Sequence, residues 1–424
     1  MRYGRAVTPQ APAVELSPAD AYGERYPASA ALMERARAVM PGGNTRTTAY
    51  YAPFPLAITR ADGPFLWDAD GNRLVDLLMN YTSLVHGHRY PPAMEAVELT
   101  LQRGTVWPAP SEEQVQLAEL LCSRIESVEQ VRFCNSGTEA GMLAVRIARK
   151  ATGRRKVLKA SQGYHGSYPE LEAGPETLQA PFGDLVAFRA AIEEHASDLA
   201  AVVLEPVLGG VITPRAGFLE GVAGAAHDAG AVLVLDEVIT LRLGIGGAQD
   251  ALGIRPDLTM MGKLIGGGFP VGAVGGRAGL MGVLDPRRPD ALPHSGTFNG
   301  NPVTCAAGYA TTAALTAGAI ERTSGQAARL AQMLEQSAAR HGVPFSLSRQ
   351  GSLLNLYLSE QPQMLRIERE DAALMDAFHL LALQHGLFLA PRGLVAMATI
   401  IDGPLLDEIG QRFDAAFADA ARLG

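Results

Sequence analysis

A single lysine in a glycine-rich turn is the residue of this chain best suited to covalent chemistry. The 424 residues include 36 lysines and arginines, of which only four are lysines. Lys150, Lys156 and Lys159 lie close together, whereas Lys263 stands alone in the sequence Met-Gly-Lys-Leu-Ile-Gly-Gly-Gly. Arginine keeps its proton, so it cannot act as an amine nucleophile or form a Schiff base. The isolated lysine therefore predicts amine chemistry at position 263.

Two further motifs contain groups that could assist such an amine. Asp236 ends the apolar run 232–235, where a buried carboxylate needs a partner. The alternative is that Asp236 only caps a helix or makes structural hydrogen bonds. The segment Asn135-Ser136-Gly137-Thr138-Glu139 follows an apolar run and opens a helical one, which is typical of a phosphate site at a helix N-terminus. An N-cap by Ser136 or Thr138 with nothing bound is the competing interpretation.

The three motifs together meet the requirements of pyridoxal phosphate. The helix N-terminus would bind the phosphate, and Asp236 would keep the pyridine nitrogen protonated so that the ring accepts electrons. Lys263 would hold the aldehyde as an imine and then transfer a proton. A nucleotide-hydrolase loop is excluded because Asp257 and Leu264 occupy the positions of its glycine and its hydroxyl residue. The dinucleotide fingerprint G-x-G-x-x-G is also absent from this glycine-rich stretch.

Alternating apolar and helical segments indicate the elements that position these residues. Between about residues 112 and 315, strands are expected at 131–134, 157–159, 202–205, 232–236 and 258–261, and helices at 138–150, 185–195 and 218–229. This alternation is typical of a mostly parallel sheet covered by helices on both faces. Ligands of such sheets bind at the carboxyl ends of the strands, where Asp236 and Lys263 are expected.

The two ends of the chain are expected to form a smaller unit. Near the N-terminus the sequence predicts a helix at 28–40 and short strands at 56–60, 65–67 and 74–77. Near the C-terminus it predicts helices at 326–340 and 371–385 and strands at 353–358 and 395–400. We therefore expect a loose arm over 1–25, the first part of a small domain over 26–85, a large domain over 86–315 and the rest of the small domain over 316–424.

Composition excludes several classes of function. The net charge of −8 and the lack of a long basic run argue against nucleic-acid binding. Cys122, Cys134 and Cys305 are too widely spaced for a zinc site or a disulfide framework. No apolar run reaches the roughly 18 residues of a membrane span, and the first 20 residues lack a signal peptide's apolar segment. We therefore expect a cytoplasmic protein. His86-Gly-His88 has no further ligands at metal spacing, so we expect no metal site there.

Over roughly residues 30–415 the chain resembles the class III (subgroup II) aminotransferases, which are pyridoxal-phosphate enzymes of fold type I. It is similar to the glutamate-1-semialdehyde 2,1-aminomutases and especially to the β-amino-acid aminotransferases. The motifs that carry the resemblance are Asn135-Ser-Gly-Thr-Glu-Ala140, Tyr164-His-Gly166, Glu205-Pro206, Asp236-Glu-Val238, Gly262-Lys263 and Gly296-Thr297. The resemblance implies an aspartate-aminotransferase-like α/β fold, with a large, mostly parallel sheet and a small α+β domain built from both termini.

The resemblance also implies roles for individual residues at the cofactor. Lys263 would bond to the cofactor and act as the proton-transfer base, and Asp236 would pair with the pyridine nitrogen. Val238 and Tyr164 would pack on opposite faces of the ring, and Glu205 would order the surroundings. The phosphate would be held by Ser136, Gly137 and Thr138, and by Thr297 of the neighbouring subunit, so a homodimer with shared active sites is implied.

Two arginines are candidates for the substrate carboxylate, because paired guanidinium hydrogen bonds suit that group. Arg46 and Arg392 stand in sequence contexts where the similar β-amino-acid aminotransferases grip their substrate. The run 239–243, Ile-Thr-Leu-Arg-Leu, departs from the Met-Thr-Gly-Phe-Arg usual in aminomutases. The sequence therefore favours ping-pong transfer from a β-amino acid or related amine to a keto acid. An intramolecular aminomutase and a racemase or decarboxylase on the same scaffold are the alternatives.

Overall fold

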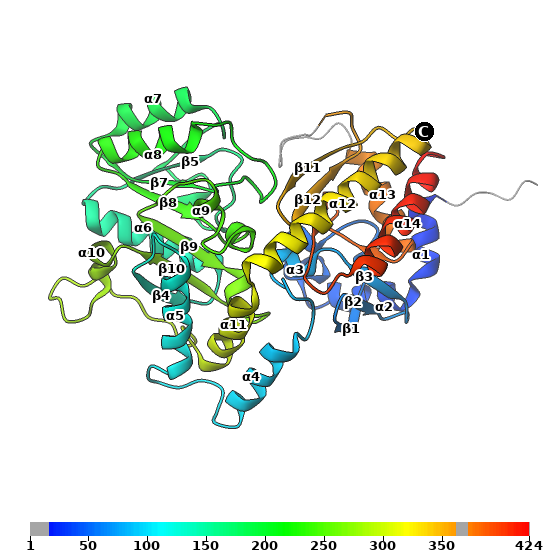
Figure 1. Ribbon diagram of the computed structural model, residues 1–424, viewed down its shortest axis with the longest axis horizontal. Helices are drawn as coiled ribbons and strands as arrows, with labels where there is room; N and C mark the ends of the chain where they lie inside the picture. The colour runs from blue at the N-terminus through cyan, green and yellow to red at the C-terminus, as the bar shows by residue number, and fades with distance from the viewer. Residues whose placement is uncertain (1–16, 362–371, 424) are drawn as a thin grey trace, which may run out of the picture.

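Three β-sheets organise the chain in the computed structural model, which describes residues 17–361 and 372–423 (Figure 1). The largest sheet has seven strands in the order β4-β10-β9-β8-β7-β5-β6. They span β4 Gln130–Cys134, β5 Lys156–Ala160, β6 Thr177–Ala180, β7 Leu199–Leu204, β8 Val232–Asp236, β9 Leu258–Gly262 and β10 Gly272–Gly276. Only β10 runs antiparallel to its neighbours, so the predicted α/β fold with a mostly parallel sheet is confirmed.

Helices cover both faces of this sheet, as its apolar strands require. Alternate residues of a strand point to opposite faces, so Val203 and Val234 pack under α6 (Gly137–Thr152). Val202 and Leu233 pack on the other face, under α7 (Leu185–His195) and α8 (Phe218–Asp228). Further helices at this part of the chain are α4 Pro91–Leu101, α5 Glu112–Arg124, α9 Ala248–Ala251, α10 Ala278–Met281 and α11 Pro302–Ala314.

Two strands of the large sheet were missed by the sequence patterns. The strand β10 reads Gly-Ala-Val-Gly-Gly, which is poor in the β-branched residues that usually signal a strand. Its glycines are required by close packing, because a Cβ on Gly272 would lie 1.9 Å from the Ser136 carbonyl oxygen. A Cβ on Gly276 would lie 2.5 Å from the Asp257 carbonyl oxygen. The strand β6 lies at the sheet edge and is only partly buried, so its apolar signal is weak.

The two ends of the chain meet in a four-stranded sheet of order β1-β2-β3-β13. The strands β1 (Ile58–Asp62), β2 (Phe65–Asp68) and β3 (Arg73–Asp76) form the expected antiparallel unit. The strand β13 (Leu387–Phe388) then pairs in parallel with β3. A three-stranded sheet adds β11 Ser346–Gln350, β12 Leu353–Tyr357 and β14 Leu394–Ala396.

Helices pack on these smaller sheets and bury further apolar clusters there (Figure 1). They are α1 Pro18–Arg25, α2 Pro27–Arg37, the short α3 Met79–Thr82, α12 Ala317–His341, α13 Ala372–Gln384 and α14 Gly403–Ala420. The helix α12 runs from the part that holds the large sheet across to the smaller sheets. In the described part of the chain, no single helix is long and apolar enough to cross a membrane, although α11 and α12, bent by 74°, meet that test as a pair.

The expected loose arm over residues 1–25 needs correction where the structure describes it. Residues 1–16 lie outside the described residues, but Pro18–Arg25 forms α1, which Ser17 caps by accepting a hydrogen bond from the Asp20 amide. Tyr22 of this helix is fully buried against Tyr26 and Phe54, so its aromatic burial anchors the segment. The predicted strand 395–400 is also shorter than expected, because β14 ends at Ala396.

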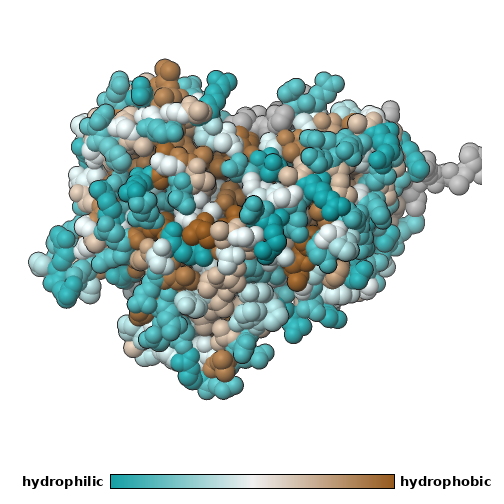
Figure 2. Space-filling model, in the orientation of Figure 1, coloured by the Kyte–Doolittle hydropathy of each residue, from teal (hydrophilic) through white to brown (hydrophobic). Residues whose placement is uncertain are grey.

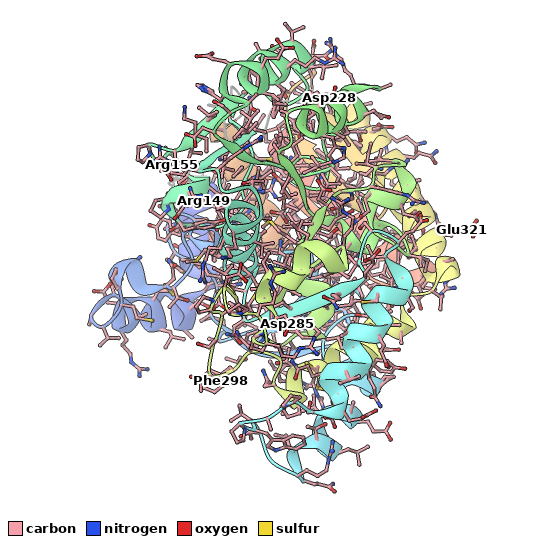
Figure 3. The ribbon with its side chains drawn as sticks, turned by 90° about the vertical axis from the view of Figure 1, so that its left-hand side faces the viewer. Arg149, Arg155, Asp228, Asp285, Phe298 and Glu321 are labelled. Carbon is pink, nitrogen blue, oxygen red and sulfur yellow. The ribbon has the colours of Figure 1, made fainter. Side chains whose placement is uncertain are left out.

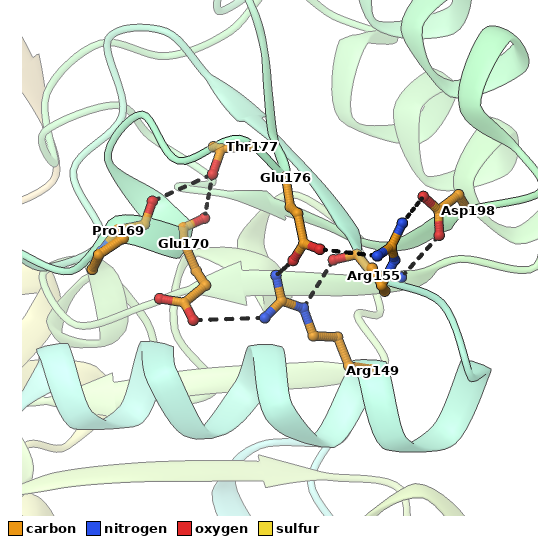
Figure 4. A network of polar contacts seen from close by, with 7 residues as sticks. All are labelled: Arg149, Arg155, Pro169, Glu170, Glu176, Thr177 and Asp198. Carbon is orange, nitrogen blue, oxygen red and sulfur yellow. Dashed lines mark hydrogen bonds and ion pairs between the residues drawn. The ribbon is translucent and has the colours of Figure 1, made fainter.

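A polar network holds the C-terminal end of α6 against its surroundings (Figure 4). Arg149 donates to Glu176 at 2.9 Å and to the Arg155 carbonyl at 2.8 Å, and it lies 3.6 Å from the Glu170 carboxylate. Arg155 in turn lies 3.8 Å from Asp198. These groups are partly exposed, and such pairs contribute at most about 1 kcal/mol each. The basic cluster around Lys150 is therefore a solvated helix end that steadies the segment between β5 and β6.

Figure 2 shows hydrophilic side chains over much of one face, with apolar ones gathered towards its middle.

The apolar core around β3, β13 and α14 can be tested by measuring the stability of a variant. Leu387 of β13 is fully buried in the core that β3 and α14 share. Leu387→Ala should lower the free energy of unfolding by about 2–5 kcal/mol, because it removes buried methyl groups and leaves a cavity. Val186 of α7 is 80% exposed, so Val186→Ala should change it by less than about 0.5 kcal/mol. Urea titrations followed by circular dichroism measure both, and equal shifts in the two variants would contradict this assignment of the core.

Candidate active site

Lys263 lies where β9 ends and a short 3-10 helix, Lys263–Gly266, begins. Its φ angle of 49° is uncommon for a residue with a side chain, and such conformations cluster at functional sites. Burial lowers the pKa of Lys263 from 10.5 to about 8, while the charges of Asp236 and Glu205 oppose this shift. The charges of Arg392 and Arg242 lower the pKa of Lys263 further. A neutral amine is thus available much nearer to physiological pH than in an exposed lysine.

Asp236 ends β8, the strand next to β9, and is buried beside two hydrogen-bond donors. One carboxylate oxygen accepts from the Val238 amide at 3.0 Å. The other lies 2.9 Å from His165 Nδ1, which donates its proton if the carboxylate is ionised. His165 was not singled out in the sequence, although it lies within the Tyr164-His-Gly166 motif. Its buried Nε2 has no hydrogen-bond partner among the described residues.

The N-terminus of α6 faces the same region. Ser136 caps the helix by accepting from the Glu139 amide at 3.1 Å, so the capping interpretation holds for its hydroxyl. The first amide N–H groups of a helix lack acceptors within the helix and remain suited to an anion. A Cβ on Gly137 would lie 3.1 Å from Val238, and one on Gly166 would lie 2.6 Å from the Thr138 hydroxyl. The segment Ser136–Thr138, Val238 and the turn Tyr164-His-Gly166 are therefore packed together.

Glu205 follows β7 and fixes two backbone segments. Its carboxylate accepts from the Tyr164 amide at 3.2 Å and from the Gly209 amide at 3.0 Å. Tyr164 itself leaves 51% of its surface exposed, so a ligand could reach it. Glu237, one residue beyond Asp236, points away and is fully buried, and its carboxylate accepts from the Ala248 and Gln249 amides. Burial raises its pKa, and its partners give it a structural role.

The two candidate substrate arginines come from opposite ends of the chain. Arg46 is exposed, donates to the Asn80 side-chain oxygen at 2.8 Å and lies with its guanidinium carbon 5.6 Å from the centre of the Tyr81 ring. Arg392 lies 3.5 Å from the Asn355 side-chain oxygen. Since its charge acts on Lys263, Arg392 lies within electrostatic range of the amine.

Thr297, the residue predicted to reach the phosphate of the neighbouring subunit, lies on a surface loop. It is exposed in the loop between the 3-10 turn Gly282–Leu284 and α11. Its neighbour Phe298 is 57% exposed and lies at the outer edge of the fold (Figure 3). Two residues after Thr297, the Asn299 side chain accepts from Asn135 at 2.8 Å, so the end of this loop lies beside the Asn135–Glu139 segment.

A buried arginine beyond Asp236 was also missed by the sequence patterns. Arg242 lies in the 3-10 helix Thr240–Leu243 and is among the largest fully buried side chains of the described residues. Sequence offers little signal for it, because arginine is abundant in this chain and its partners lie far away along it. No group of three or more histidine, cysteine, aspartate or glutamate side chains in residues 17–361 and 372–423 could hold a metal ion.

The residues present fit pyridoxal phosphate. A dry amine and a buried carboxylate stand at the ends of neighbouring strands, and a helix N-terminus with close-packed glycines lies beside them. An amine, a ring-nitrogen partner and a phosphate site are the three groups that this cofactor needs from a protein.

Comparison with known proteins agrees with this geometry. The family model for class-III aminotransferases matches residues 47–173 and 168–417. A beta-phenylalanine transaminase of Variovorax paradoxus is 40% identical over 95% of each chain. A glutamate-1-semialdehyde 2,1-aminomutase of Methanothrix thermoacetophila is 37% identical over 86% of this chain and 90% of its own. A solved transaminase with pyridoxal phosphate bound superposes with a TM-score of 0.89 at 34% identity, covering 94% of this chain and 99% of its own.

The charges around Lys263 predict that two substitutions shift its pKa in opposite directions. In the cofactor-free protein, acylation of Lys263 should follow a pKa of about 8, since only the neutral amine reacts. Asp236→Asn removes a charge that favours the protonated amine, so the pKa should fall further. Arg392→Gln removes a positive charge, so the pKa should rise.

Quantitative labelling across pH 6–11, read by mass spectrometry, measures each pKa, and Lys150, which is partly exposed on the far end of α6, serves as the internal reference. Identical titration of Lys263 and Lys150 would refute the proposed dry environment.

Proposed function

Because the chain belongs to the class-III aminotransferases, which are pyridoxal-phosphate enzymes, we propose that it moves an amino group from a β-amino acid or related amine to a keto acid. The observation that carries the proposal is Lys263, an amine with a pKa lowered to about 8 beside Asp236. The two half-reactions would follow a ping-pong order, in which the donor gives up its amino group and its keto product leaves before the acceptor binds.

Pyridoxal phosphate, when bound, supplies an aldehyde carbon for amines and a conjugated ring that accepts an electron pair. Lys263 would bond to it at rest and, once released, move the proton at the substrate carbon. Asp236, held by His165 and the Val238 amide, would keep a proton on the ring nitrogen. The phosphate would be held by Ser136, Gly137 and Thr138, while Val238 and Tyr164 would flank the ring and Glu205 would order the Tyr164 backbone.

The substrate carboxylate would bind to Arg46 or Arg392, both of which carry guanidinium groups suited to bidentate contact. The identity of 40% to a beta-phenylalanine transaminase over nearly the whole chain supports a β-amino acid as donor. The second candidate is intramolecular amino transfer, which the 37% identity to a glutamate-1-semialdehyde aminomutase supports. A racemase or decarboxylase is the remaining alternative on this scaffold.

We further propose a homodimer in which Thr297 completes the phosphate site of the partner subunit. Thr297 and Phe298 are exposed on a loop whose end, at Asn299, contacts Asn135, and a residue shared between subunits would need such exposure. The domain boundaries at 26–85, 86–315 and 316–424 fit the sheets, since the large sheet uses strands between 130 and 276 only. The three free, widely spaced cysteines favour the cytoplasm.

A half-reaction assay tests the proposed activity. With β-phenylalanine alone, the visible absorbance band of the loaded enzyme should disappear, and 2-oxoglutarate or pyruvate should restore it. Lys263→Ala should slow amino transfer by at least about 100-fold, as expected for loss of a proton-transfer base. Lys263→Arg is the matched control for charge and should lose as much, because arginine keeps its proton.

Three results would redirect the assignment. Retained activity in Lys263→Arg would exclude an amine mechanism. Conversion of glutamate-1-semialdehyde without a second substrate would favour the aminomutase. Exchange of the substrate α-hydrogen without amino transfer would favour a racemase.

The shared site predicts complementation between two inactive variants. Lys263→Ala lacks the amine, and Thr297→Asp would repel the phosphate of the partner subunit. Mixed dimers contain one site with both native residues, so co-expression should restore activity that neither variant has alone. Gel filtration and activity of the mixture measure this outcome. A monomer, or a mixture without activity, would contradict the shared site.

A further inference from the structure

Arg242 is a buried cation whose hydrogen-bond acceptors in the described part of the chain are all neutral. It donates to the Thr82 carbonyl at 3.0 Å, to the Ser352 hydroxyl at 3.2 Å and to the Met397 carbonyl. Within residues 17–361 and 372–423 it forms no salt bridge. Burial lowers its pKa only to about 10, so it stays charged at neutral pH. An unpaired charge in the interior is costly, and its three contacts join three segments that are far apart in the sequence.

One of these segments is strained. The four residues of α3, Met79–Thr82, have positive φ angles of 49°, 46°, 55° and 77°, although none of them is glycine. Such backbone persists only where its surroundings hold it. Asp76 fixes the start of the segment by accepting from the Leu78 and Met79 amides at 2.8 Å. Arg242 fixes its end through the Thr82 carbonyl.

The strained segment carries the two side chains that hold Arg46. Asn80 accepts from its guanidinium, and the Tyr81 ring lies beside the same group. The Tyr81 hydroxyl also donates to the Thr48 carbonyl, which ties the segment to the turn after Arg46. Arg46 is exposed and makes no salt bridge within the described residues, so its position depends on this segment.

We propose that Arg242 is a positioning residue for substrate selection: by clamping the Thr82 carbonyl, it sets the Asn80–Tyr81 platform that aims Arg46 at a substrate carboxylate. This inference rests on the proposed function, in which a carboxylated amine is the donor. Arg242 acts on the substrate carboxylate through Arg46, while its charge, which also acts on Lys263, is kept in a lysine variant. It makes carboxylate recognition depend on contacts between the part of the chain after β8 and the segments at Ser352 and Met397.

Lysine cannot replace this arginine. The guanidinium presents its donors in a rigid fork, and Nε, Nη1 and Nη2 each meet a different acceptor. A lysine keeps the charge but ends in one nitrogen, so Arg242→Lys should release at least one of the three segments. Arg124 provides a matched control, because it also donates to three carbonyls, those of Ile245, Thr312 and Leu315, none of which belongs to the segment that holds Arg46.

Binding of 3-phenylpropanoate, a carboxylate without an amino group, tests the proposal without turnover. Calorimetry on the loaded enzyme should show that Arg46→Gln raises the Kd about 10- to 100-fold, as loss of a charge-assisted contact does. Arg242→Lys should raise it about 3- to 10-fold. Arg242→Lys should have no effect in the Arg46→Gln background, because both changes act on one contact. Arg124→Lys should leave the Kd unchanged even where it lowers the Tm.

Asn80→Gly tests the same proposal independently, in case Arg242→Lys does not fold. Glycine tolerates the φ angle of 46° and removes the acceptor of Arg46, so this variant should raise the Kd as Arg242→Lys does. An unchanged Kd in Asn80→Gly, or additive effects of Arg242→Lys and Arg46→Gln, would overturn the positioning role alone. An unchanged Kd in Arg46→Gln, or no binding to the wild type, would overturn it together with the proposed substrate contact. The half-reaction assay reports on amino transfer independently.

Discussion

The amine of Lys263 must lie in a dry environment and still feel negative charge, and much of the architecture follows from that requirement. Burial alone would drive the amine to its neutral form, while Asp236 and Glu205 oppose it. These three residues stand at the ends of β9, β8 and β7, which are neighbours in the large sheet. Parallel strands bring their carboxyl ends to one edge of the sheet, so residues from three separate stretches of sequence form one cluster of charged side chains there.

Positive charge reaches this cluster from the smaller sheets. Arg392 comes from the turn between β13 and β14, and its charge acts directly on Lys263. Arg46 is held further out by Asn80 and Tyr81. Arg392 and Arg242 therefore set positive charge against the carboxylates at the strand ends around Lys263. A substrate with both an amine and an acid group would meet complementary charges from the two parts of the molecule.

The sequence could predict the groups at the strand ends because buried parallel strands leave long apolar runs, as at 199–204 and 232–236. It could not predict β10, where contact with the Ser136 backbone demands glycine instead of an apolar side chain. His165 was missed because a histidine has no pattern of its own, and only the fold brings it to Asp236. Arg242 was missed because its acceptors at Thr82, Ser352 and Met397 belong to segments that only the tertiary structure joins.

The pairing of β13 with β3 has a consequence for synthesis on the ribosome. The strands β1 to β3 emerge early, but the partner of β3 lies near the end of the chain. The large sheet can form while the edge of β3 still exposes unpaired backbone groups, which are prone to wrong pairing. This long separation slows closure of the small sheet, because distant segments must find each other. The small sheet can therefore be completed only after the strands of the large sheet have all been synthesised.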